Sequence, residues 1–256
     1  MKDIQSQPDG RNIPINRVGI KNLKHPIRVL DKANKIQDTV ATISMYVDLP
    51  HTDKGTHMSR FVELLSTFHT NISYKEFSRI LSQMKHHLNA QTSHIEIDFP
   101  FFIAKKAPVT ASVGMMDYRC KIVAKSSASN KVDLILEVFV PISSVCPCSK
   151  EISVYGAHNQ RGEVHLRTRS NSLVWLEDMI HLVEKCASCE IYSVLKRKDE
   201  KYVTEHAYNN AKFVEDIARD IVLELKQRTD IIWFTVSVEN FESIHNHSAY
   251  AYISSE

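Results

Sequence analysis

The chain has 256 residues, of which 43% are hydrophobic, so it can bury a sizeable core in one large domain or two modules. Its 32 basic and 30 acidic residues give a formal net charge of +2, and this balance gives no reason to expect a nucleic-acid partner. The sequence lacks both a run of about eighteen apolar residues and an apolar stretch of signal-peptide type. We therefore expect a cytoplasmic protein without a membrane partner.

The first half of the chain predicts an arm followed by a mixed module. Residues 1–37 are polar and interrupted by prolines, which indicates a mostly irregular N-terminal arm. Apolar and polar residues then alternate over 40–49, as in a half-buried strand that ends at Pro50. The elements expected next are helices at 59–68 and 74–88 and strands at 95–99, 111–124 and 132–140.

The second half predicts the same kinds of element in a similar order. We expect a strand at 163–169, a helix at 173–184, one long helix at 204–226, and strands at 232–238 and 249–253. This order predicts an α+β fold built from a unit used twice, with antiparallel sheets that each carry two helices on one face. The modules would span 38–141 and 142–256 and form a single functional unit.

The segment Cys146-Pro147-Cys148-Ser149-Lys150 carries the strongest chemical signal. It places two thiols two residues apart at the end of an apolar strand pattern. A thiolate is both a soft metal ligand and a nucleophile or proton carrier, and a nearby cation favours its ionisation. His158 and the pair His245 and His247 lie downstream and supply further candidate ligands. The five cysteines are an odd number, which favours reduced thiols or metal ligation over a disulfide framework.

Several motifs occur together in one order, and their combination resembles a known family. They are the CPCSK segment, Lys54-Gly55-Thr56-His57-Met58-Ser59-Arg60-Phe61, Gly156-Ala157-His158-Asn159-Gln160-Arg161 and Lys201-Tyr202-Val203-Thr204-Glu205. From about Val40 to the C-terminus the chain resembles the prokaryotic type IB GTP cyclohydrolase I. The resemblance implies a tandem tunnelling fold, assembled as a homotetramer with active sites at subunit interfaces. It also implies conversion of GTP and water to 7,8-dihydroneopterin triphosphate and formate, the entry step to folate-type pterins.

The same resemblance implies a divalent metal, zinc or manganese, held by Cys146, His158 and Glu200. Three protein ligands and an open position form a catalytic arrangement, because a bound metal lowers the pKa of water toward neutrality. Water must be activated in this way to add at C8 of guanine. The mixed sulfur, nitrogen and oxygen set leaves the choice between zinc and manganese open.

The remaining roles implied by the resemblance concern protons and substrate. Cys148 and His245 are the candidates for proton transfer, since imidazole titrates near neutral pH. Glu215 is the candidate anchor for the N1–H and 2-amino donors of guanine. Candidates for further substrate contact, mainly with the triphosphate, are Lys150, Arg161, Lys196, Arg197 and His57.

Alternative readings of the same residues remain open at this stage. The cysteines Cys146, Cys148, Cys186 and Cys189 would suit a structural zinc site in a binding module. A nitrile reductase of the same fold, acting on a deazaguanine, would share the anchoring glutamate, although no nicotinamide-binding motif is found here. Cys146 and Cys148 also form a hypothetical redox switch.

Overall fold

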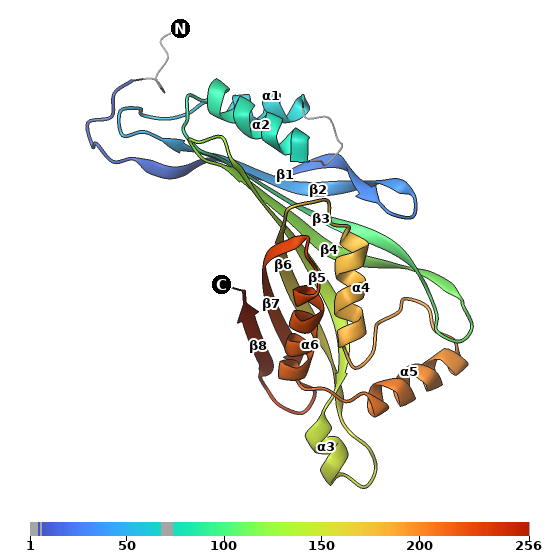
Figure 1. The fold of residues 1–256 in the computed structure, drawn as a ribbon. Coiled ribbons are helices and arrows are strands. Elements are labelled where there is room, and N and C mark those ends of the chain that lie inside the picture. Colours follow the sequence, from blue (N-terminus) through green and yellow to red (C-terminus); the bar gives the residue numbers. More distant parts are fainter. Residues whose placement is uncertain (1–4, 6, 68–73, 256) are drawn as a thin grey trace. The chain divides into compact units, whose positions relative to one another are not determined.

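The computed structural model describes residue 5, residues 7–67 and residues 74–255. The strands of the described residues form one sheet with the hydrogen-bonded order β1-β2-β3-β4-β5-β6-β7-β8 (Figure 1). The elements, in chain order, are β1 (Ile15–Asp31), β2 (Lys35–Leu49), α1 (Met58–Ser66), α2 (Tyr74–His87), β3 (Ser93–Lys106), β4 (Val113–Ser126), β5 (Val132–Val145), α3 (Pro147–Ile152), β6 (Asn159–Ser170), α4 (Leu176–Cys186), α5 (Arg197–Asn209), α6 (Val214–Lys226), β7 (Ile231–Phe241) and β8 (Ser248–Ser254). This architecture confirms the predicted α+β class with antiparallel pairing and helices on one face of the sheet.

The prediction of an irregular arm is wrong from Ile15 onward, because β1 occupies Ile15–Asp31 and pairs with β2 in antiparallel register. Its alternation is real, since Ile27 and Val29 are buried while Arg28 between them is exposed. The strand was not predicted because Pro26 lies within it and proline is typical of irregular segments. Pro26 is tolerated here because β1 is an edge strand, where a proline leaves no ladder hydrogen bond missing inside the sheet.

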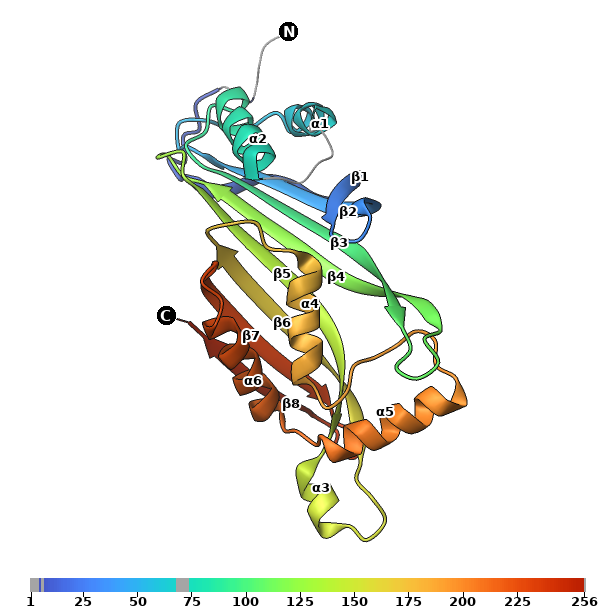
Figure 2. The same ribbon diagram turned by 45° about the vertical axis from the view of Figure 1, so that its right-hand side comes forward.

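The chain divides into two compact units, of which the first comprises Met1–Phe99 and Lys121–Ile135. In this unit α1 and α2 pack on one face of the sheet (Figures 1 and 2). Phe61 of α1 and Phe77 of α2 are buried, as are the inward residues of β2 and β3 such as Ile43 and Ile97. The period of two in the strands and the amphipathic pattern in the helices therefore build one shared core.

The second unit comprises Pro100–Cys120 and Leu136–Glu256, and it holds the CPCSK segment. Here α4 and α6 cover one face of β5, β6 and β7 (Figure 2). Ile180 and Ile217 of the helices are fully buried, and so are Val164 and Val238 of the strands. The predicted division at 141 and 142 stays a prediction. Within the described part of the chain, no helix is long and apolar enough to cross a membrane.

The single helix predicted at 204–226 is instead two helices, α5 and α6, which is a correction to the sequence reading. Asn210 ends α5 with a non-helical conformation (φ −113°, ψ 43°). The backbone N–H of Phe213 then donates to the Asp216 carboxylate (3.0 Å), which starts α6. An apolar face continuous across the junction concealed this break. The helix predicted from 173 begins at Leu176, and the end of the helix predicted at 59–68 lies outside the described residues.

Candidate functional site

Cys146 occupies the junction where β5 ends and the short helix α3 begins. It is the N-cap of α3, and Pro147 follows at the first helical position, where its missing N–H costs no hydrogen bond. The Cys146 Sγ accepts a hydrogen bond from the Ser149 N–H (3.4 Å), which fixes the orientation of the thiol. Cys148 lies in α3 and is exposed, while Cys146 is half-buried. The two thiols therefore have different surroundings, as their different predicted roles require.

His158 lies directly beside Cys146, on the segment that leads into β6. The Cys146 N–H donates to the His158 carbonyl (3.1 Å), and the His158 N–H donates to the Ser149 Oγ (3.1 Å). Its ring Nδ1 lies 3.0 Å from the Gln160 Oε1. A proton on Nδ1 donated to this oxygen leaves the lone pair on Nε2, the tautomer that binds a metal. The structure thus brings two of the three predicted ligands together.

Glu200 lies in the first turn of α5 and is exposed. Val203 and Ala207, at three and seven positions beyond it, belong to an apolar cluster with Val145 and Ala157. Through these two residues α5 packs beside the direct neighbours of Cys146 and His158. Nevertheless, the described residues contain no group of three His, Cys, Asp or Glu side chains arranged to hold a metal ion. The donor types fit zinc or manganese.

The turn between β7 and β8 also borders His158. The Ser243 Oγ lies 3.4 Å from the His158 Nδ1, and His245 stacks on His247 with ring centroids 5.1 Å apart. Both of these imidazoles are exposed. His245 is therefore two residues from a direct neighbour of His158, while its predicted role in proton transfer stays a prediction.

The predicted substrate contacts are spread over several elements. Glu215 is exposed in the first turn of α6, and Arg161 is exposed on β6 opposite Ser143. Lys150 donates to the Tyr208 carbonyl (2.7 Å), so it joins α3 to the end of α5. His57 belongs to the first unit, where it is the half-buried N-cap residue of α1. Two further basic residues were predicted to contact phosphate. Lys196 is the N-cap of α5, and Arg197 is the first residue of that helix.

Cys186 and Cys189 are packing residues, and the structure does not group them with Cys146 and Cys148 as a metal site among the described residues. Both are buried, whereas Cys148 is exposed, and burial raises the pKa of each of the two thiols to about 11. A buried neutral thiol of this kind packs as a small apolar residue. Cys189 instead exchanges two backbone hydrogen bonds with Ser143 (3.1 and 3.3 Å), just before the CPCSK segment.

Asp199, next to Glu200, has a structural role that the sequence reading missed. Its carboxylate accepts hydrogen bonds from the N–H groups of Val109, Thr110 and Lys196 and from the Thr110 hydroxyl. Burial opposes its ionisation, but these hydrogen bonds outweigh that effect and hold the pKa of Asp199 below its usual range. They fix the first turn of α5. An aspartate three residues into a helix was the available signal.

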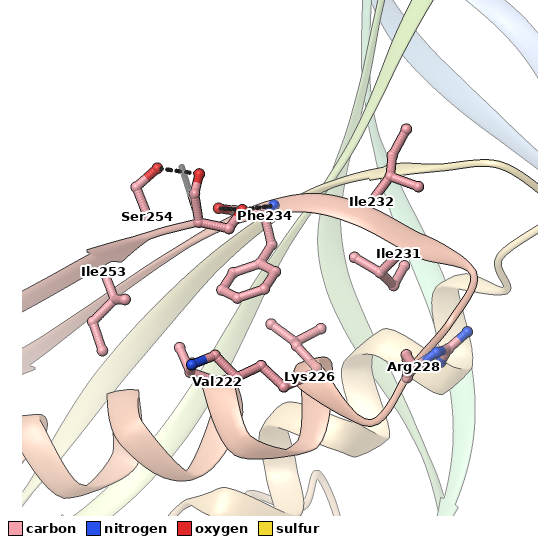
Figure 3. A pocket seen from close by; sticks show the side chains of 10 residues that line it. Val222, Lys226, Arg228, Ile231, Ile232, Phe234, Ile253 and Ser254 are labelled. Carbon is pink, nitrogen blue, oxygen red and sulfur yellow. Dashed lines mark hydrogen bonds between the residues drawn. The ribbon is translucent and has the colours of Figure 1, made fainter.

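A cavity of about 490 Å³ lies elsewhere in the second unit, beside α6, β7 and β8 (Figure 3). Apolar side chains such as Phe234 and Ile253 line it, with Lys226 and Arg228 at its border. None of the predicted site residues lines this cavity. The candidate site is therefore the surface around Cys146 and His158 and not this cavity.

The sheet, its helices on one face and its strand order define a protein of the tunnelling fold. Urate oxidase from Bacillus subtilis 168 superposes with a TM-score of 0.55 and 8% identity, covering 93% of this chain and 98% of that one. Uricase from Arthrobacter globiformis gives a TM-score of 0.52 and 9% identity, with 93% and 92% covered. At such low identity these likenesses show the fold alone.

Sequence comparison gives the particular family. The family model described as type I GTP cyclohydrolase folE2 matches residues 1–251. Proteins named GTP cyclohydrolase FolE2 are 64% identical in Desulfosudis oleivorans and 56% in Syntrophobacter fumaroxidans. Each covers 99% of this chain, which covers 97% and 98% of their lengths, respectively. The chain belongs to the type I GTP cyclohydrolase FolE2 family, and this match does not favour the nitrile reductase alternative.

Proposed function

We propose that this protein is a metal-dependent GTP cyclohydrolase, which converts GTP and water to 7,8-dihydroneopterin triphosphate and formate in the first step of folate biosynthesis. The family match supports the reaction. The observation that carries the site is the pairing of Cys146 with His158 through their backbones, which places a thiol and an imidazole at one strand end. A cytoplasmic location and a homotetramer with active sites at subunit interfaces belong to the same proposal.

Cys146, His158 and Glu200 would hold the metal, zinc or manganese. When bound, the metal would activate water for addition at C8 of guanine. The Gln160 contact would orient the His158 ring so that Nε2 faces the metal, and the Ser149 N–H would orient the Cys146 sulfur. Glu200 would join them from the first turn of α5, a helix whose Val203 and Ala207 pack against Val145 and Ala157.

The chain's other residues would bind GTP and move protons. Exposed Cys148 and His245 would carry protons to and from the opening ring, from which C8 leaves as formate. The Glu215 carboxylate offers two acceptors to the N1–H and 2-amino groups of guanine. The candidates for contact with the triphosphate or with other parts of the substrate are Lys150, Arg161, Lys196, Arg197 and His57.

The test is metal-dependent turnover. The protein is stripped with a chelator, given GTP with or without zinc or manganese, and assayed for formate and for the fluorescent pterin formed after oxidation. We expect both products only with metal, and loss of both in Cys146→Ala. Cys186→Ala is the matched control, because Cys186 is buried away from solvent and should retain turnover. Equal loss in the two variants, or no product with either metal, would refute the proposal.

A further inference from the structure

The segment 186–190 binds the strand end that precedes Cys146. Ser143 and Cys189 exchange backbone hydrogen bonds, and the Ser188 Oγ accepts from the Val145 N–H (3.3 Å). Ser188 is fully buried. The residue directly before Cys146 is therefore held by a side chain of this segment, so a shift of the segment would shift Cys146 with it.

Asn210 joins the same segment to α5. Its side-chain Nδ2 donates to the carbonyls of Ala187 (2.9 Å) and Ser188 (3.1 Å), and its backbone N–H caps the last turn of α5. Two residues later, the Lys212 N–H donates to the Val145 carbonyl (3.1 Å). A carboxamide has two N–H donors in one plane, which matches two successive carbonyl acceptors. A carboxylate of the same shape has none.

From these contacts we propose that Asn210 is a positioning residue for the metal site, an inference that rests on the proposed function. One side chain links the helix that carries Glu200 to the segment that holds the backbone before Cys146. Ala187 and Ser188 are almost completely buried, so without Asn210 their carbonyls lose donors that water cannot easily replace. The helix then shifts against the strand end. The helix that carries Glu200 and the strand end that carries Cys146 are then no longer held together, and metal affinity falls.

The experiment compares Asn210→Ala and Asn210→Asp with Asn209→Ala. Asn209 is the matched control, because it is the adjacent residue of the same type and is exposed at the end of α5. Zinc affinity of the purified full-length proteins is measured by competition with a chromophoric chelator. We expect both Asn210 variants to bind zinc roughly 10–100-fold more weakly, the usual effect of losing a residue that orients metal ligands. Asn209→Ala should bind as the wild type does.

Two further readouts separate positioning from loss of folding. Thermal melting of the metal-free proteins shows whether each variant is folded, and the visible absorption of the cobalt(II)-loaded proteins reports the ligand geometry. Weaker binding with an altered cobalt spectrum in a folded variant supports the proposal. If neither Asn210 variant folds, Ser188→Ala, which removes only the acceptor for Val145, should show the same two changes.

The positioning role would be overturned if a folded Asn210 variant kept the zinc affinity and the cobalt spectrum of the wild type. If both Asn210 variants fail to fold, the same result in Ser188→Ala would overturn it. A wild-type protein that binds zinc but does not convert GTP would refute the proposed function, and the comparison of affinities would still decide the role of Asn210. A wild-type protein that binds neither zinc nor manganese would overturn both.

Discussion

Replacement of Lys105 by Met should destabilise the second unit strongly, because it removes the cation from a buried polar cluster. The Lys105 Nζ lies 2.6 Å from the Glu184 Oε1 and 2.9 Å from the Glu190 Oε2. The side chain of Glu184 is 1% exposed, and it also accepts from the Tyr118 hydroxyl (2.6 Å). Methionine has about the same length as lysine but leaves the Glu184 carboxylate without the Lys105 cation, with only His181 among the described residues as a possible cationic partner.

The expected loss is about 3–5 kcal/mol of unfolding free energy, the usual cost of removing one partner of a buried ion pair. For a chain of this size, 1 kcal/mol corresponds to about 2–4 °C, so the melting temperature should fall by about 6–20 °C. Burial opposes ionisation of Glu184, but His181 and Lys105 outweigh it and lower the pKa of Glu184. A carboxylate with a lowered pKa stabilises the fold above its ordinary pKa. The difference from the wild type should therefore shrink as the pH falls below about 4.

Urea unfolding and calorimetry of the two proteins measure this loss. Lys106→Met is the matched control, because Lys106 is the next residue on β3 and is exposed; its effect should stay within about 0.5 kcal/mol. Adding Glu184→Gln to Lys105→Met should recover part of the stability, since the uncompensated charge is then absent. Equal stability of Lys105→Met and Lys106→Met would refute the reasoning.

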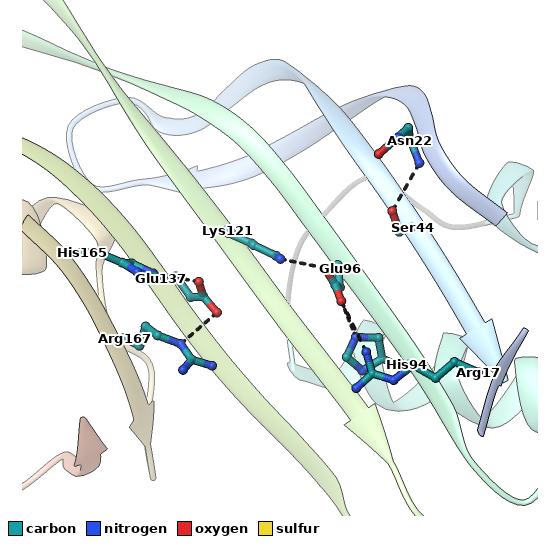
Figure 4. Close-up of polar contacts among 9 residues, drawn as sticks. All are labelled: Arg17, Asn22, Ser44, His94, Glu96, Lys121, Glu137, His165 and Arg167. Atoms are coloured by element: carbon teal, nitrogen blue, oxygen red, sulfur yellow. Dashed lines mark hydrogen bonds and ion pairs between the residues drawn. The ribbon is translucent and has the colours of Figure 1, made fainter. Parts of the chain in front are cut away.

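Two further predictions concern other parts of the sheet. In the first unit, burial opposes ionisation of Glu96, but hydrogen bonds from Lys121 and His94 outweigh it and lower the pKa of Glu96 from 4.5 to about 2 (Figure 4). Glu96→Gln should therefore lower the free energy of unfolding at pH 7, and the difference from the wild type should disappear as the pH falls from 4.5 to about 2. A difference in unfolding free energy that does not change with pH in urea titrations would contradict this. In the second unit, a Cβ on Gly162 would lie 2.7 Å from the Glu239 carbonyl oxygen, so Gly162→Ala should cost about 1–3 kcal/mol by calorimetry. Gly10→Ala, with no atom within 4 Å of the added Cβ, is its control, and equal melting temperatures would count against the close approach.

Periodicity predicted most strands and helices because their residues face one core. The periodicity argument failed at two places, where a single residue or an apolar pattern suggested a different element from the one that forms. Pro26 indicated an irregular segment, yet an edge strand accepts it. The continuous apolar face of 204–226 indicated one helix, yet Asn210 ends α5 through hydrogen bonds to a segment more than twenty residues earlier. Such long-range partners leave no periodic trace in a sequence.

The candidate site was predicted in the same uneven way. The motifs that carry Cys146 and His158 were apparent, and the structure places these residues side by side. The residues that support them were not apparent, because Ser188 and Asn210 are common residue types whose roles depend on distant contacts. Elsewhere on the sheet, the buried Glu137 carboxylate likewise has partners distant in the sequence, since it accepts from His165 and Arg167 on the adjacent strand (Figure 4).

The division of labour among the cysteines follows from their surroundings. Cys146 precedes a short helix at a strand end and is half-buried with an N–H donor, while Cys148 lies on that helix and is open to solvent. Cys186 and Cys189 flank the buried segment that holds this strand end, and their raised pKa keeps them neutral. A neutral thiol in a core packs as a small apolar residue. The C-x-x-C pair that suggested a zinc site therefore flanks the segment that binds the strand end before Cys146.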